Sequence, residues 1–200
     1  NRVKNWKSVD GAMMYGMFGT DWVDSYAYVT GYNASTNTVT ISGSENPSKS
    51  GRYFFYNVLE EVDTVGEYYL DNETGILYLY APENYKSVPI RFAVCRNYVM
   101  TAQVDYYTFD GITFECGVDS LILLNGNHNT FKNCIIRNCS ESGLDFVGDG
   151  NVFYNNELSY IGGGGISGEM SNTAEMIHSQ TVIDNNLIHD YAELHRVYNA

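Results

Sequence analysis

The 200-residue sequence is poor in positive charge, with 11 lysines and arginines against 24 aspartates and glutamates and a net charge of −13. Nucleic acids and anionic membranes are bound through clustered positive charge, so this balance argues against both as partners. Apolar runs are short as well, since none reaches the ~18 residues that a membrane-spanning helix requires. The composition is typical of a soluble protein that handles neutral or cationic ligands.

Cysteine is scarce and shows no paired pattern. The four cysteines form no CxxC pair and have no histidine at zinc-finger spacing, so we expect neither a metal centre nor a cofactor. Buried free thiols are favoured over a disulfide.

Helical periodicity is missing too. Between Tyr107 and Tyr191 no ten-residue stretch has apolar residues at helical spacing, which disfavours a helical or leucine-rich repeat.

A unit of 22 residues recurs over this stretch, with three apolar positions that return in phase. They are Phe109, Phe131 and Phe153; Phe114, Ile136 and Leu158; and Met100, Ile122, Leu144 and Ile166. A fourth copy around Ile183 comes 30 rather than 22 residues after the third, so it carries eight extra residues within Gly168–Gln180. Repeats this short bury a core only by stacking on one another.

Each unit contains two or three short runs of alternating apolar residues, the pattern of a β-strand. The sequence therefore predicts an all-β fold, a right-handed parallel β-helix of about four coils whose equivalent strands lie about 4.8 Å apart. Asn133, Asn155 and Asn185 share one position of the unit. We interpret this column as a stacked corner in preference to a ligand site.

The first 88 residues lack the 22-residue period and carry hairpin signals instead. Polar turns are flanked by Tyr26–Thr30 and Thr38–Ser42, and by Glu67–Leu70 and Ile76–Tyr80. A short helix is predicted over Tyr56–Val62, with Asn57 as its cap. We expect two domains, a small antiparallel β domain over residues 1–88 and a β-helix over residues 89–200 that is truncated at its C-terminal end.

The segments Tyr68–Tyr80 and Gly19–Asp24, together with the coils, resemble secreted bacterial right-handed parallel β-helix proteins. Most of these are glycoside hydrolases, of β-xylosidase-like and α-fucosidase-like families. The resemblance covers nearly the whole chain and implies sugar chemistry on an outer face of the stack. It also implies a secreted or cell-surface location, although Asn1–Lys4 shows no signal peptide. The family implies several coils beyond Ala200, so we expect a fragment whose last coil is capped by a missing continuation or a second chain.

Hydrolysis of a glycosidic bond requires two carboxylates, one on either side of the bond. Strand alternation predicts that Asp145 points outward between Leu144 and Phe146, and that Glu169 shares the direction of Ser167. One coil step plus two residues along a strand separates the two Cα atoms by roughly 8 Å. We therefore predict Asp145 and Glu169 as the catalytic pair. The competing interpretation is a solvated acidic face in a protein with 24 acidic residues.

Polar residues near this face are candidates for substrate binding. His178 lies in the insertion, and long loops are where binding residues concentrate. The segment after the last coil adds Glu193, His195, Arg196 and Tyr198. Such side chains bind hydroxyls and carboxylates, and an Arg-x-Tyr pair recurs here in the resembling proteins, although a polar terminal loop is also simply soluble. The run Gly162–Gly165 either opens room for a ligand or forms a sharp corner.

The leading hypothesis is part of a glycoside hydrolase that acts on a polysaccharide or oligosaccharide. A polysaccharide lyase needs a basic residue near a cation or an arginine cluster, yet only Lys132 and Arg137 lie in the repeats. The third possibility is a noncatalytic carbohydrate-binding or scaffold module that presents aromatic side chains. The 18 tyrosines and 9 phenylalanines suit such a surface, and they equally suit β-rich cores.

Overall fold

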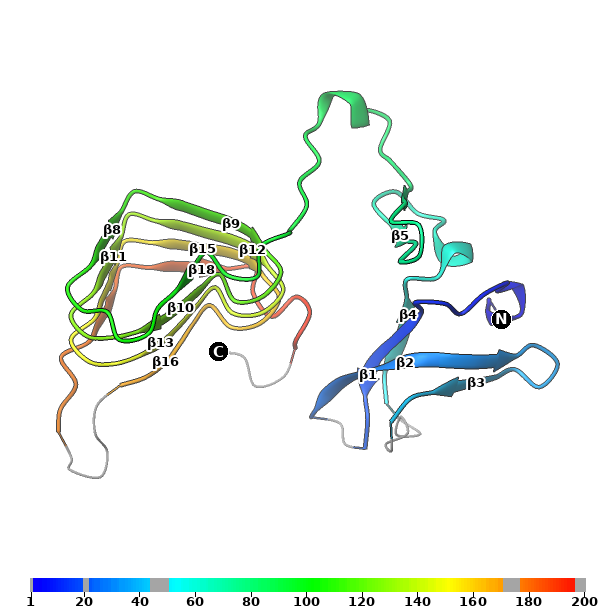
Figure 1. Cartoon of the computed structure of the whole chain (residues 1–200), viewed down its shortest axis with the longest axis horizontal. Coiled ribbons are helices and arrows are strands. Elements are labelled where there is room, and N and C mark those ends of the chain that lie inside the picture. Colours follow the sequence, from blue (N-terminus) through cyan, green and yellow to red (C-terminus); the bar gives the residue numbers. More distant parts are fainter. Residues whose placement is uncertain (1, 20–21, 44–50, 171–176, 197–200) are drawn as a thin grey trace. The chain divides into compact units, whose positions relative to one another are not determined.

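The computed structural model describes residues 2–19, 22–43, 51–170 and 177–196. The chain divides into two compact units, residues 1–90 and residues 91–200. Within the described residues the regular structure consists of strands and three short 3-10 turns, with no α-helix (Figure 1). The described residues also contain no helix with the length and hydrophobicity of a membrane span.

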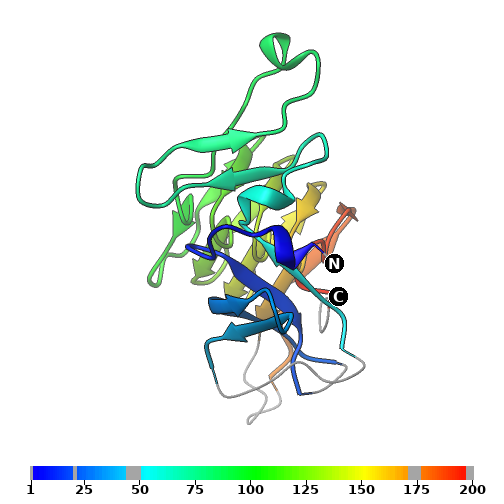
Figure 2. The same ribbon diagram turned by 90° about the vertical axis from the view of Figure 1, so that its right-hand side faces the viewer.

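A four-stranded antiparallel sheet forms most of the first unit, in the order β3-β2-β1-β4. Its strands are β1 (Met13–Met17), β2 (Asp24–Asn33), β3 (Thr38–Ile41) and β4 (Tyr53–Tyr56). A second hairpin joins β5 (Tyr68–Leu70) to β6 (Leu77–Leu79), and Figure 2 shows it as a separate pair of arrows above the sheet. Both predicted hairpins are therefore confirmed. One face of the sheet packs on a small core around Trp6, Val29 and Phe55.

The predicted helix over Tyr56–Val62 is wrong. Only a 3-10 turn, η2 (Leu59–Glu61), forms there, and Val58 precedes it. Asn57 adopts a left-handed conformation with φ of 55° and caps no helix. Its side chain instead donates to the carbonyls of Gly11 and Leu70 and accepts from the Leu70 amide, because these backbone groups would otherwise lack partners. The two other 3-10 turns are η1 (Val3–Asn5) and η3 (Tyr85–Ser87).

Three parallel sheets of four strands each form the second unit. The first sheet contains β7 (Val99–Met100), β10 (Ile122–Asn125), β13 (Leu144–Val147) and β16 (Ile166–Glu169). The second sheet contains β8 (Thr108–Asp110), β11 (Thr130–Lys132), β14 (Val152–Tyr154) and β17 (Val182–Asp184). The third sheet contains β9 (Thr113–Gly117), β12 (Ile135–Cys139), β15 (Glu157–Ile161) and β18 (Leu187–His189). The chain visits the sheets in turn, which makes a parallel β-helix (Figure 1).

The inward columns lie where the 22-residue step places them. Phe131 pairs in register with Phe109 and Phe153, and its ring stacks on theirs at centroid distances of 4.4 and 6.0 Å. Ile136 pairs likewise with Phe114 and Leu158. Both Phe131 and Ile136 are fully buried. The predicted all-β fold with its parallel β-helix is therefore confirmed.

The prediction for one member of the third column, Met100, is wrong. Ile122 pairs with Val99, whereas Met100 pairs with Leu123 and is 70% exposed. Both residues of β7 are apolar, so the sequence alone does not choose between them. Val99 is the one that packs against the core, which shifts the first coil by one residue relative to the repeat.

The asparagine column forms a corner between the second and third sheets, as expected. Asn133, Asn155 and Asn185 all have φ near 54°, a left-handed conformation that asparagine tolerates better than most residues. Their side chains form a ladder, in which Asn155 donates to Asn133 at 2.8 Å and Asn185 donates to Asn155 at 3.0 Å. The column is structural, since each amide is bonded to the coil next to it.

The glycine run forms the corner that leads from the third sheet back to the first. All four glycines, Gly162–Gly165, are buried. A Cβ atom on Gly162 would lie 2.0 Å from the Ser140 carbonyl oxygen, and one on Gly165 would lie 2.6 Å from Ile188. The corner interpretation is therefore correct, because the neighbouring coils occupy the space that a ligand would need.

The four cysteines are free thiols. Cys134 and Cys139 are buried, as expected, but Cys95 is exposed because it precedes the first full coil.

The inward residues of the last coil are more exposed than those of the coils before it. Ile183 continues the column of Phe131 but is 46% exposed, since no described strand lies beyond β17 in its sheet.

Candidate functional site

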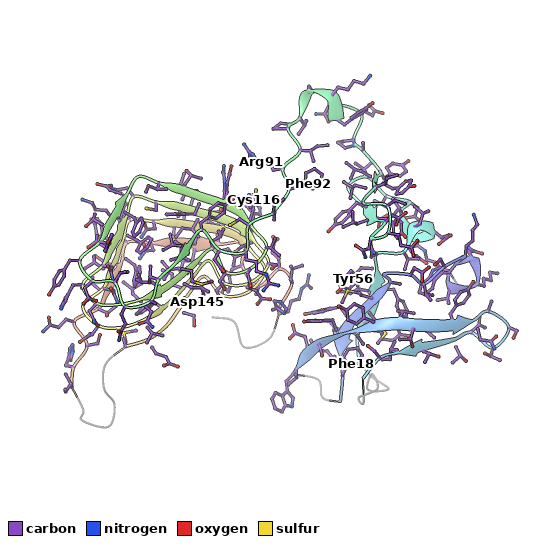
Figure 3. The ribbon with its side chains drawn as sticks, viewed as in Figure 1. Phe18, Tyr56, Arg91, Phe92, Cys116 and Asp145 are labelled. Carbon is purple, nitrogen blue, oxygen red and sulfur yellow. The ribbon has the colours of Figure 1, made fainter. Side chains whose placement is uncertain are left out.

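The outward face of the first sheet carries the candidate site. Strand pairing aligns Leu123, Asp145 and Ser167 in one outward column, and Asn125, Val147 and Glu169 in the next. These two columns line an open hollow of about 490 Å³. Figure 3 marks Asp145 on the side of the stack where Figure 1 labels β10, β13 and β16. The strand period thus places both predicted carboxylates in one depression.

Asp145 is half-buried and held in place. Its Oδ2 atom accepts a hydrogen bond of 2.8 Å from the hydroxyl of Ser120, a residue that is only 7% exposed. The Ser120 Oγ atom in turn accepts from the backbone N–H of Ser142 at 3.3 Å. This chain fixes one carboxylate oxygen and leaves Oδ1 without a protein donor among the described residues. Sequence reasoning missed Ser120, although Ser120 and Ser142 follow the 22-residue step.

Glu169 ends β16 and is exposed. It pairs in register with Val147, two residues beyond Asp145 on the adjacent strand. One strand step and two residues give a Cα separation of roughly 8 Å. Carboxyl groups carried at that separation can reach the ~5 Å spacing of a retaining glycosidase or the ~8 Å spacing of an inverting one. The structure therefore places the two predicted carboxylates on one outward face, on adjacent strands and two residues apart in register.

The insertion leaves the stack at the end of β16, beside Glu169, and its last residues are tied to Asp149. The Asp149 carboxylate accepts from the Ser179 hydroxyl and from the Gln180 N–H. These bonds, with that of Ser179 the strongest cause, lower the pKa of the Asp149 carboxyl. His178 is exposed and does not line the hollow. Its predicted binding role therefore depends on a substrate that extends past the edge of the first sheet.

The segment after β18 runs along the opposite border of the first sheet. The N–H groups of Ala192 and Leu194 donate to the carbonyls of Gly163 and Gly162, at the corner before β16. His195 Nε2 lies 3.2 Å from Glu141 Oε1 at the same corner one coil earlier. Glu193 and Arg196 are exposed, and none of these three predicted residues lines the hollow. Tyr198 lies outside the described residues.

The basic residues of the repeats lie on other faces. Lys132 belongs to the second sheet and lies 3.2 Å from Asp110, and Arg137 belongs to the third sheet and donates to Glu115 at 2.8 and 2.9 Å. Residues lining the hollow include no lysine, arginine or histidine in the part of the chain that the structure describes. The described residues also contain no group of three or more metal-ligating side chains. Asp145 and Glu169 are the charged side chains among the described residues that line the hollow.

A second polar cluster, also missed from the sequence, lies on the third sheet. His189 Nδ1 is 2.9 Å from Asp190, its Nε2 is 3.4 Å from Glu157, and these contacts raise the pKa of the imidazole, with Asp190 the larger cause. Its outward neighbour in register, Ser159, is only 2% exposed. That burial leaves no space for a ligand at the serine, so the cluster is an ion-pair network on the surface of the stack.

Residues 94–195 match the family of right-handed β-helix regions. Searches of curated proteins and of solved structures each found no match. The matched segment covers half of the chain and contains all three parallel sheets, their corners and both residues of the carboxylate pair. The chain belongs to the right-handed β-helix family.

Proposed function

We propose that this chain is part of a carbohydrate-active enzyme, a glycoside hydrolase that uses Asp145 and Glu169 as its carboxylate pair. Right-handed β-helix regions are found in carbohydrate-active proteins such as pectate lyases and glycoside hydrolases. The observation that carries the choice is the hollow of the first sheet, which contains two carboxylates one strand apart and no basic side chain among the described residues. A polysaccharide substrate is consistent with a protein that acts outside the cell.

The two carboxylates have different surroundings, and this assigns their roles in the proposal. Ser120 fixes one oxygen of Asp145, so the other oxygen has a defined position from which to attack the anomeric carbon or activate a water. Glu169 is exposed at the end of β16, beside the insertion, and would protonate the leaving oxygen once a sugar covers it. Ser120 is then a positioning residue for Asp145.

The test uses the protein with a panel of aryl glycosides. Asp145→Asn and Glu169→Gln should each lower kcat by several orders of magnitude while Tm stays unchanged. Glu157→Gln is the matched control, because Glu157 is an exposed acid on the third sheet. Ser120→Ala should lower kcat less than Asp145→Asn, since it loosens the carboxylate without removing it. Full activity in both amide variants would refute the assignment.

A noncatalytic carbohydrate-binding module is the second candidate. The hollow is open, and the described candidates for binding, His178, Glu193, His195 and Arg196, do not line it. An open hollow of this kind can bind the side of a long glycan, and it can equally hold the bond that an enzyme cleaves. Glycan binding without turnover, with binding weakened by Asp145→Asn, would favour the module over the enzyme. A lyase is disfavoured, because Lys132 and Arg137 are paired with acids on other faces.

A further inference from the structure

The outward face of the four-stranded sheet in residues 1–90 is covered with aromatic side chains. Strand pairing arranges them in two rows, Tyr28–Met13–Tyr56 and Tyr26–Tyr15–Phe54. The opposite face of the same strands carries Met14 and Ala27, which are buried in the core. Alternation along β1, β2 and β4 thus separates an apolar core face from an aromatic face. We call these five rings with Met13 the aromatic face.

The rings of the aromatic face are exposed and lie against one another. Tyr26, Tyr28 and Phe54 are 58%, 59% and 55% exposed, although large aromatic side chains usually avoid such exposure. The Phe54 ring contacts Tyr15 at a centroid distance of 5.3 Å and Tyr56 at 6.2 Å. Neighbouring strands at about 4.8 Å and alternate residues at about 7 Å make the face a nearly continuous platform.

Tyr56 lies at one end of this platform, on the edge strand β4. Partial burial raises the pKa of the Tyr56 phenol, and the nearby phenols of Tyr26, Tyr28 and Tyr68 raise it further. Tyr68 is 63% exposed. A second hollow of about 510 Å³ adjoins the platform there, lined by Met13, Phe54, Tyr56 and Tyr68 among others. The face therefore adjoins a recess that is lined by two tyrosines, Tyr56 and Tyr68, and by two carboxylates, Glu61 and Glu67.

The platform itself is uncharged. Its rows contain only tyrosine, phenylalanine and methionine, and the next row holds one charge of each sign. In that row Asp24 is paired with Met17 and accepts from the Tyr15 hydroxyl, and continuation of the β4 register places Arg52 on the other side of Met17. An anionic or cationic polymer finds no complementary charge on these rings. A protein partner would have to bury several phenol hydroxyls, each of which costs free energy unless it is hydrogen-bonded.

We propose that the aromatic face binds a neutral glycan chain, with sugar rings lying flat on Tyr26, Tyr28 and Phe54 and with sugar hydroxyls bonded to the tyrosine hydroxyls. A sugar ring has an apolar C–H face that packs on an aromatic ring and a polar edge that needs donors and acceptors. Tyrosine supplies both, because it joins an apolar ring to a hydroxyl that donates and accepts. The site is separate from the carboxylate pair and does not depend on catalysis there.

Affinity gel electrophoresis of the 200-residue chain tests this proposal. The gels contain hydroxyethylcellulose, arabinoxylan or galactomannan as neutral probes, and carboxymethylcellulose or polygalacturonate as anionic ones. At least one neutral polymer should retard the chain more than either anionic polymer. A double variant, Tyr28→Ala with Tyr56→Ala, should weaken that retardation about tenfold, because it removes the stacking ring of Tyr28 together with the ring and hydroxyl of Tyr56 beside the recess.

Two variants make the result specific. Tyr85→Ala removes an exposed tyrosine of η3, outside the aromatic face, and should leave retardation unchanged. Replacing Tyr28 and Tyr56 with phenylalanine keeps the rings and removes the hydroxyls, so it should weaken binding less than alanine does. Retardation that survives Asp145→Asn but falls in the double alanine variant belongs to this face, whereas a loss of turnover in Asp145→Asn concerns only the proposed hydrolase.

Four results would overturn the proposal, three from binding and association and one from thermal unfolding. The first is no retardation on any neutral polymer. The second is equal loss in the Tyr85→Ala control. The third is self-association that the double alanine variant abolishes, measured by sedimentation, because the aromatic face would then be an interface between copies of the chain. Thermal unfolding accompanies each variant, and a fall in Tm as large as that for a buried ring would show that the face is covered by protein.

Discussion

Replacement of Phe131 by alanine probes the central column of the β-helix. The Phe131 side chain is fully buried, and its ring lies between those of Phe109 and Phe153 at 4.4 and 6.0 Å. Phenylalanine-to-alanine changes in cores cost about 3–5 kcal/mol. We expect the upper part of this range, because the strands on either side are paired in register and cannot move together to close the cavity.

Urea unfolding followed by circular dichroism measures this cost, since a shift in midpoint at constant m gives the change in stability. In thermal unfolding, about 2–4 °C per kcal/mol in a chain of this size predicts a fall in Tm of roughly 8–20 °C for a cost of about 4–5 kcal/mol. Tyr154→Ala is the matched control. Tyr154 follows Phe153 on β14 but points outward and is 43% exposed, so the cost should stay below about 1 kcal/mol. Equal shifts in the two variants would refute the assignment of inward and outward positions.

Two further predictions concern titratable groups. Burial raises the pKa of the Cys139 thiol to about 12, so alkylation at pH 8 followed by mass spectrometry should modify the exposed Cys95 first and leave Cys139 intact in the folded protein. Equal labelling would contradict this order. The lowered pKa of Asp149 stabilises the fold above the unfolded value of about 4, and this contribution is lost as pH falls through the folded value. Hydrogen-exchange protection of the Gln180 amide should therefore fall below about pH 4, and Asp149→Ala, which removes the acceptor oxygen, should remove it at pH 7; unchanged protection in the variant would disprove the anchor.

The columns of the β-helix can be predicted from the sequence because burial and backbone conformation restrict them. An inward position accepts only apolar side chains, so the 22-residue step that joins Phe109 to Phe131 also identifies their contact. The corner at Asn133 and Asn155 can be predicted from the sequence in the same way, since a φ near 54° disfavours most residue types other than glycine and asparagine. Fold class, strand direction and the outward direction of Asp145 all follow from these two restrictions.

The contacts around Asp145 could not be predicted in the same way. Ser120 and Asp145 are 25 residues apart, and their hydrogen bond crosses the corner between the third and first sheets. Its length depends on how the backbone turns there, and hydrophobic periodicity carries no information about that path. The first coil shows the same limit. Val99 and Met100 are both apolar, and only packing against the coil above decides which of them faces inward.

The outward columns also explain why the candidate site lies where it does. An inward column repeats one kind of residue, as in Phe109, Phe131 and Phe153, because each coil must fill the same space. The outward column beside it contains Leu123, Asp145 and Ser167, three unrelated side chains on the same backbone frame. Packing of the core does not restrict which residues occupy these positions, so they can be reactive or binding residues. The paired strands fix the distances between them. A carboxylate at the centre of such a column, fixed by a buried serine, is a departure from the repeat that the fold itself does not require.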